Sequence, residues 1–110
     1  MPYKIVPTSV FKKQVKRLQK EYKHIKQDLH QLGMLLKTNP KSGKPLGKKT
    51  YKIRLNSSDM KKGKRGGFRI ITFVNDETKK VYLLTIYAKS KQMNITEQEI
   101  KEILKQESLF

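Results

Sequence analysis

The chain has 110 residues, of which 35% are hydrophobic; this is enough for one core, so we expect a single domain over residues 1–110. It contains no cysteine and no run near the ~20 apolar residues that span a bilayer, which excludes disulfides, thiolate zinc sites, cysteine nucleophiles and a membrane protein, and fits a cytoplasmic location. The formal net charge is +17, from 26 Lys and Arg against 9 Asp and Glu, and indicates a polyanionic partner, with nucleic acid the leading candidate.

The first forty residues predict a strand followed by helices. Residues 3–6 form the strand, and Thr8 is a candidate helix cap. Apolar residues then recur at spacings of three and four from Phe11 to Leu36, which is typical of amphipathic helices. We expect two helices packed as a hairpin, with a break near residues 21–23, although one long bent helix is an alternative.

The rest of the chain predicts a loop, three strands and a helix. Residues 41–49 (KSGKPLGKK) are rich in Gly, Pro and Lys, which is typical of a loop. A capping box at residues 96–99 (TEQE) opens the helix. The three strands are expected over residues 50–55, 68–74 and 81–88, with a turn at 75–80 that makes the last two antiparallel.

This order of elements predicts an α+β domain. We expect a small, largely antiparallel four-stranded sheet with an N-terminal helix hairpin and a C-terminal helix. The helices should cover one face of the sheet, so the uncovered face is where a functional site is expected.

The positive charge is concentrated in the middle of the chain. Of the 26 basic residues, 12 lie between Lys37 and Arg69, with Asp59 as the only acid. Residues 60–69 (MKKGKRGGFR) combine cations with glycines that let the backbone approach a ligand, which suits phosphate. The sequence has neither a GxxxxGK[ST] loop nor a GxGxxG turn before a helix, so nucleotide hydrolysis is not expected.

If the strands pair in register, four basic residues and one tyrosine from separate strands converge on one surface. These residues are Lys52, Arg54, Arg69, Tyr87 and Lys89. Cleavage of RNA needs a base for the 2′-hydroxyl proton, an acid for the leaving 5′ oxygen, and positive charge at the phosphate. Crowding by other cations and partial burial both disfavour the charged form of a lysine, so a lysine cluster can supply its own base.

Histidine-based and metal-dependent cleavage have less support in the sequence. His24 and His30 are six residues apart on a helical pattern and point in different directions. The few acidic residues form no paired carboxylates of the kind a Mg²⁺ nuclease uses, so we expect neither a metal nor a cofactor.

Three segments resemble a known family. YKIRL at residues 51–55, GKRGGFRIITFV at 63–74 and VYLLTIYAKS at 81–90 resemble the RelE/ParE superfamily of type II toxins, closest to the HigB-like branch. The resemblance implies a metal-independent endoribonuclease that cuts mRNA in the ribosomal A site and inhibits translation. It also implies a cognate antitoxin, typically one with a helix-turn-helix DNA-binding domain.

The resemblance and the charge pattern together nominate site residues. Ser90 stands where RelE toxins have a catalytic arginine, and Tyr87 lies earlier than the family's late tyrosine, so the assignment of base and acid stays open. The predicted catalytic residues are Arg54, Lys64, Arg65, Arg69, Tyr87 and Lys89. The predicted RNA-binding residues are Lys48, Lys49, Lys52, Lys61, Lys62 and Lys91.

Two other functions remain as alternatives. A ParE-like toxin shares the fold but poisons DNA gyrase, and the concentrated basic cluster argues against it. A non-catalytic RNA- or ribosome-binding module would explain the net charge of +17, but the sequence has no RNP aromatic pair and no KH-type GXXG loop followed by a helix.

Overall fold

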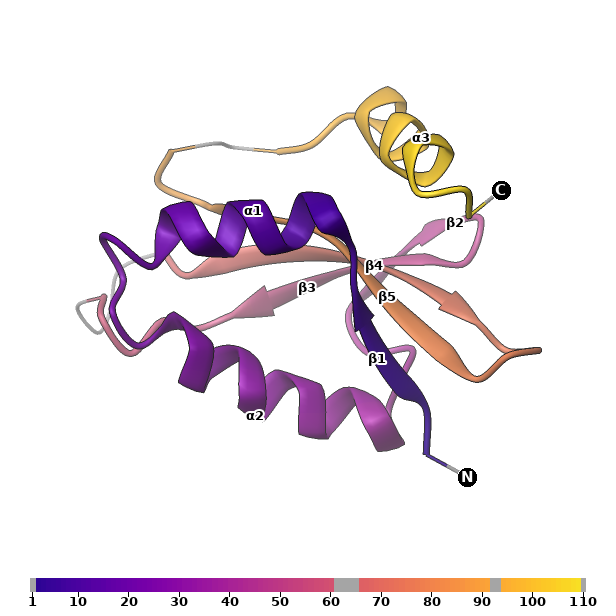
Figure 1. Ribbon diagram of the computed structural model, residues 1–110, viewed down its shortest axis with the longest axis horizontal. Helices are drawn as coiled ribbons and strands as arrows, with labels where there is room; N and C mark the ends of the chain where they lie inside the picture. Colours follow the sequence, from indigo (N-terminus) through magenta and orange to yellow (C-terminus); the bar gives the residue numbers. More distant parts are fainter. Residues whose placement is uncertain (1, 61–65, 92–93, 110) are drawn as a thin grey trace.

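The computed structural model describes residues 2–60, 66–91 and 94–109, which form three helices and five strands. Figure 1 shows them as a sheet with helices packed against it. In chain order the elements are β1 (Lys4–Pro7), α1 (Ser9–Leu18), α2 (Ile25–Thr38), β2 (Lys44–Gly47), β3 (Thr50–Leu55), β4 (Phe68–Asn75), β5 (Lys80–Ala88) and α3 (Glu97–Gln106).

The strands form one mixed sheet in the order β1-β5-β4-β3-β2, so the prediction of four strands is wrong. The additional strand, β2, lies within residues 41–49, where we predicted a loop. All four of its residues are exposed at the edge of the sheet, and one is Pro45, so no alternating pattern marks it in the sequence. The sheet is mixed because β1 pairs parallel with β5, whereas the other neighbours pair antiparallel.

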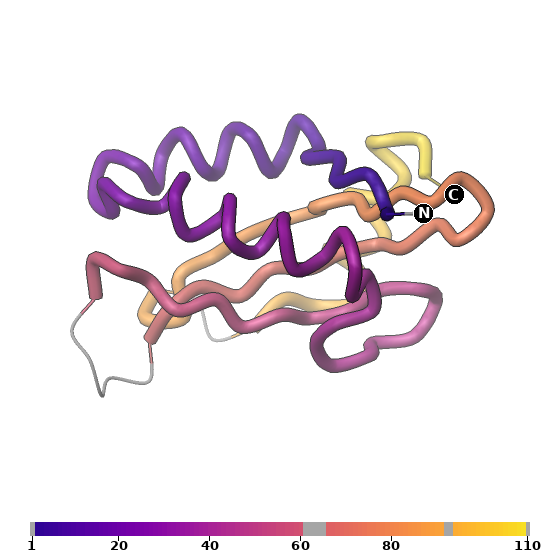
Figure 2. Tube along the Cα trace, turned by 90° about the horizontal axis from the view of Figure 1, so that it is seen from below, coloured from indigo at the N-terminus to yellow at the C-terminus, as the bar shows by residue number. Residues whose placement is uncertain are grey.

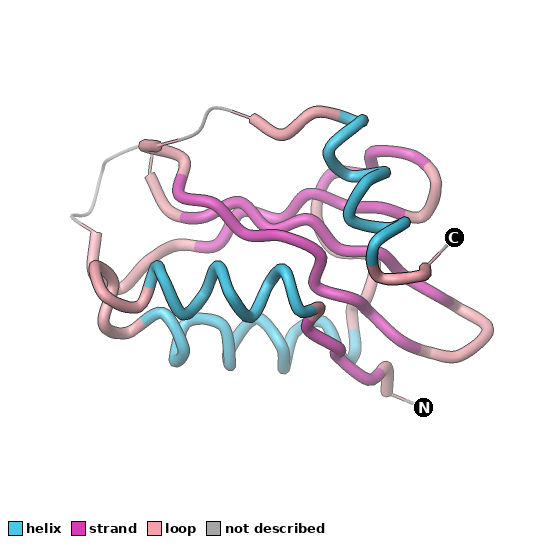
Figure 3. Tube along the Cα trace, turned by 45° about the horizontal axis from the view of Figure 1, so that its top comes forward, coloured by secondary structure: helices cyan, strands magenta, loops and turns pink. Residues whose placement is uncertain are grey.

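Helices cover both faces of the sheet, which corrects the expectation that they share one. Figure 3 shows α1 and α2 on one side of the strands and α3 on the other. The larger core joins the helix pair to the sheet, and its members include Phe11, Ile25, Leu36, Phe68, Ile70 and Val81. A smaller cluster joins α3 to the opposite face through Ile71, Leu84, Ile100 and Leu104. Ile70 and Ile71 are adjacent in β4 and both fully buried, one in each cluster. Such a run of apolar residues is typical of a strand covered on both faces, and our expectation of one covered face did not use this signal.

The predicted helix boundaries are confirmed. α1 ends at Leu18 and α2 begins at Ile25, and Figure 2 shows the two helices running side by side along the sheet as the expected hairpin. Thr8 caps α1 by accepting a hydrogen bond from the Phe11 backbone N–H at 3.2 Å. The predicted capping box of α3 is present, with both the Thr96 and the Glu99 side chains bonded to backbone N–H groups.

A bulge in β5 decides which way its last residues face. Between Ile71 and Thr72 the paired residues on β5 advance by two positions, from Thr85 to Leu83, instead of one. Ile86 therefore joins Leu83 in the larger core, although the two are three residues apart. Unbroken alternation from Leu83 would point Tyr87 into this same core. The bulge turns it to the α3 face instead.

The end of β5 beyond β1 is a free edge that α1 covers. β1 pairs with β5 only as far as Leu83. Further along, the Gln14 side-chain oxygen accepts hydrogen bonds from the Ile86 backbone N–H at 2.9 Å and from the Thr85 hydroxyl at 3.0 Å. This contact satisfies the unpaired edge and fixes α1 beside the residues that follow.

Candidate functional site

Three predicted site residues form a row across the sheet. In the antiparallel pairing Arg54 lies opposite Arg69, and Arg69 lies opposite Tyr87. Directly opposed residues project to the same face of a sheet, so the three side chains share the face on which α3 packs. Because α3 packs over Ile71, two residues after Arg69, this cationic row lies beyond the helix along the strands.

Lys52 lies beside the row on the same face. It precedes Arg54 by two residues in β3, and its Nζ donates a hydrogen bond to Asn94 Oδ1 at 3.2 Å. Burial lowers the pKa of Lys52 below its usual range, and the positive charges of Lys44, Lys89 and Arg69 lower it further. Both causes were expected of the predicted cluster, and they make the Lys52 amine easier to deprotonate.

The backbone at the start of β4 holds Arg69. Its Nη1 donates to the carbonyl oxygens of Gly66 at 3.2 Å and Phe68 at 3.3 Å, which leaves other guanidinium N–H groups for a ligand. Gly67 has φ +79°, and a Cβ there would lie 2.5 Å from the Leu55 carbonyl oxygen. Only glycine fits this close approach, so the position of Arg69 depends on Gly67.

Tyr87, in β5, is the third residue of the row. The residue is buried, with 7% of its surface exposed, and its hydroxyl has no hydrogen-bond partner among the residues that the structure describes. Burial raises the pKa of Tyr87, while the nearby Arg69 lowers it. The phenol is therefore protonated at neutral pH and can donate a hydrogen bond or a proton, but it is not a base.

The two predicted lysines that follow β5 point to different places. Lys89 is half-buried, and its backbone N–H donates to the Gly67 carbonyl oxygen at 3.1 Å, which fixes it beside the loop that holds Arg69. Lys91 instead pairs with Glu21 at 2.7 Å next to the end of α1. An RNA-binding role for Lys91 would require this exposed ion pair to open.

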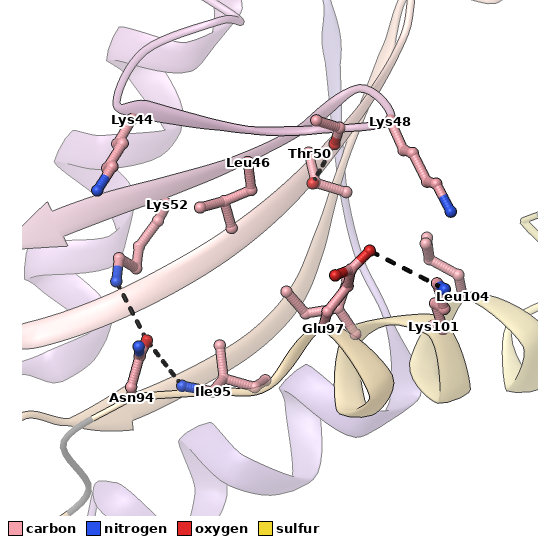
Figure 4. A pocket seen from close by; sticks show the side chains of 12 residues that line it. Lys44, Leu46, Lys48, Thr50, Lys52, Asn94, Ile95, Glu97, Lys101 and Leu104 are labelled. Carbon is pink, nitrogen blue, oxygen red and sulfur yellow. Dashed lines mark hydrogen bonds and ion pairs between the residues drawn. The ribbon is translucent and has the colours of Figure 1, made fainter.

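Lys48 and Lys49 form the turn between β2 and β3, near α3 and away from the cationic row. Both are exposed and have positive φ, 51° and 65°. Lys48 also lines a groove of about 240 Å³ between the β2–β3 hairpin and α3, shown in Figure 4. Sequence reasoning missed Lys44 and Lys101, which line this groove too, because it predicted β2 as a loop and did not place α3 against it.

Four predicted site residues, Lys61, Lys62, Lys64 and Arg65, lie outside the described residues. Within the described ranges, no group of three or more His, Cys, Asp or Glu side chains could hold a metal ion. None of the helices in those ranges is long and apolar enough to cross a membrane.

Two solved structures share this fold. One is a mutant of the E. coli toxin RelE in the free state, with 20% sequence identity and a TM-score of 0.62 over 96% of this chain and 98% of that one. The other is the toxin-antitoxin complex RelBE2 from Mycobacterium tuberculosis, with 21% identity and a TM-score of 0.54 over 78% of this chain and 96% of that one. The likeness defines the fold as that of the RelE-like α+β proteins.

The sequence also matches the model of a known protein family. A family model described as the RelE toxin of the RelE/RelB toxin-antitoxin system matches residues 8–109. The chain therefore belongs to the RelE toxin family, as its resemblance to the RelE/ParE superfamily predicted.

Proposed function

We propose that this RelE-family toxin is a ribosome-dependent, metal-independent endoribonuclease that cuts mRNA in the A site and so inhibits translation. One observation carries the proposal. Lys52 is partly buried among cations that lower its pKa, on the same sheet face as Arg54 and Arg69. This arrangement supplies a base beside positive charge, which is what cleavage through the 2′-hydroxyl requires.

In this mechanism the neutral Lys52 amine takes the proton of a 2′-hydroxyl, whose oxygen attacks the adjacent phosphorus. The bond between phosphorus and the 5′ oxygen of the next nucleotide then breaks. Arg69 and Arg54 stabilise the negative charge that develops on the phosphate oxygens. The 5′ oxygen receives a proton, so the products are a 2′,3′-cyclic phosphate and a 5′-hydroxyl.

Two groups can protonate the leaving oxygen. Tyr87 is part of the row, and Lys89 follows it in the chain. The Tyr87 hydroxyl has no partner within the described part of the chain, and a buried polar group without a partner is rare in folded proteins. Tyr87→Phe separates the two candidates. Slower single-turnover cleavage would assign the proton to the phenol, and an unchanged rate would assign it to Lys89.

A geometric argument supports the proposed ribosome dependence. A cationic surface binds any phosphate backbone, but cleavage needs the attacking and leaving oxygens in line with phosphorus, which a flexible strand rarely adopts alone. We therefore expect slow cleavage of free RNA and efficient cleavage of the same message on ribosomes, mapped by primer extension. Equal rates on the two substrates would count against a site completed by the ribosome.

We further propose that a cognate antitoxin, with a helix-turn-helix DNA-binding domain, silences this toxin. The RelBE2 structure is a toxin-antitoxin complex, which supports a protein partner of this kind. Induction of the toxin alone should stop translation and growth, and co-expression of the antitoxin should restore both. DNA damage with intact transcripts after induction would favour gyrase inhibition instead.

A further inference from the structure

The groove between the β2–β3 hairpin and α3 combines apolar walls with a cationic rim (Figure 4). It is distinct from the cationic row but shares Lys52 with the candidate cleavage site. The side chains of Leu46, Ile95, Ile100 and Leu104 form the apolar walls. The charged residues that line it are Lys44, Lys48, Lys52, Lys101 and Glu97.

The rim and the interior of the groove suit different ligands, because the charges lie at the rim and the walls are apolar. Four lysines against one carboxylate attract a phosphate backbone to the rim. Glu97 is exposed at the rim as well, with its carboxylate 3.9 Å from Lys101 Nζ. Inside, the aliphatic walls disfavour a phosphate, because burying a charge without hydrogen bonds is costly. The interior therefore suits a flat, neutral ring. Its volume of about 240 Å³ is below the ~300–1,000 Å³ of sites for drug-sized ligands, as expected for one ring system.

We propose that this groove binds one base of single-stranded RNA, from a nucleotide that flanks the cleaved phosphate. The proposal rests on the proposed function, because Lys52 is both the base proposed there and part of the groove wall. The hydrogen bond from Lys52 Nζ to Asn94 Oδ1, at 3.2 Å, joins the two sites directly. A base seated in the groove would hold its own phosphate next to Lys52 and so help to set the in-line geometry.

The test measures binding without cleavage, so that it does not depend on the proposed activity. Short RNA oligonucleotides with 2′-O-methyl riboses cannot react, and each is made with a normal base or an abasic sugar at one position. Removing one particular base should weaken binding about five- to tenfold, near the lower end of what one stacked base contributes. Removing the others should have little effect.

Leu46→Asp, in the apolar wall, should abolish this difference, and Lys101→Ala, at the cationic rim, should weaken the binding of normal and abasic RNA alike. Matched variants elsewhere should do neither. Leu46→Asp adds a carboxylate to the groove, whereas Leu35→Asp changes a comparably exposed leucine on α2; the two side chains are 39% and 46% exposed. Lys101→Ala removes a groove cation, and Lys105→Ala removes one from the same helix outside the groove. Lys101→Ala and its control Lys105→Ala keep the test valid if Leu46→Asp disturbs the edge strand.

Two results would overturn the proposal. One is that no single abasic position matters, or that the sensitive position stays sensitive in Leu46→Asp and Lys101→Ala leaves RNA binding unchanged. The other is that groove variants leave RNA binding unchanged but weaken the complex with antitoxin, which would make the groove a protein-docking site. A ribosome assay with the unmodified message reports on cleavage separately, so failure of the groove and failure of the proposed activity are distinguishable.

Discussion

Arg54 and Arg69 lie directly opposite each other in the antiparallel pairing of β3 and β4. Like charges in directly opposed positions of a sheet are destabilising. The protein therefore holds two cations together at a cost in folding free energy, as expected where a site is preorganised to bind an anion.

This relationship predicts that stability and activity change in opposite directions. Arg54→Glu should pair with Arg69 and raise the free energy of unfolding by about 0.2–1 kcal/mol, the usual range for such pairs. The same variant should lose cleavage, because a carboxylate repels the reacting phosphate. Urea denaturation measures the first effect and single-turnover cleavage the second. Arg17→Glu, on the exposed face of α1, is the control, and a less stable Arg54→Glu would contradict the pairing argument.

The lowered pKa of Lys52 predicts how cleavage depends on pH. The base must be neutral, so the rate should rise with pH until the pKa of Lys52 is passed, and the rise should lie below the ordinary lysine value of 10.5. Lys44→Met removes one of the charges that lower this pKa. The rising limb of the pH profile of Lys44→Met should therefore shift to higher pH, and its cleavage at neutral pH should be slower.

A pH profile of single-turnover cleavage tests the role of Lys52. Lys37→Met, an exposed charge on α2, should leave the profile unshifted. If Lys44→Met and Lys37→Met both give the wild-type profile, the base is another group.

The backbone geometry of the turn between β2 and β3 predicts a pair of substitutions that stabilises the protein. Lys48 and Lys49 both have positive φ, the geometry of a two-residue hairpin turn that favours Asn-Gly. The double variant Lys48→Asn, Lys49→Gly should raise the free energy of unfolding by about 0.5–1 kcal/mol. A shift of the urea midpoint to higher concentration, with an unchanged slope, would be the expected result. A destabilised double variant would mean that these lysines make contacts worth more than the backbone strain.

Every described element except β2 could be predicted from the sequence. The helix hairpin and the strands β3, β4 and β5 each bury at least one apolar face. β2 buries none, so its pairing at the sheet edge left no signal. The apolar side of α3 was visible, but a helical pattern does not say which face of a sheet it meets.

The candidate site could likewise be predicted only in part. Strict alternation in β3 was enough to predict that Lys52 and Arg54 share a face, and pairing brings Arg69 to them. The direction of Tyr87 depends on the bulge, which is a property of the pairing and not of the local sequence. Lys44 and Lys101 line the same groove only because of tertiary packing, so no spacing in the chain could predict that they share it.

The most direct test of the account compares Arg69→Ala with Lys12→Ala in single-turnover cleavage on saturating programmed ribosomes. Arg69 sits within the cationic row, whereas Lys12 is exposed on α1. Arg69→Ala should slow cleavage by on the order of 10²-fold or more with ribosome affinity little changed, as expected for a preorganised charge that acts in the transition state. Lys12→Ala should weaken binding slightly and leave the chemical step intact. If Arg69→Ala cleaves at the wild-type rate once binding is saturated, the cationic row is a docking surface and the protein is a non-catalytic ribosome-binding module.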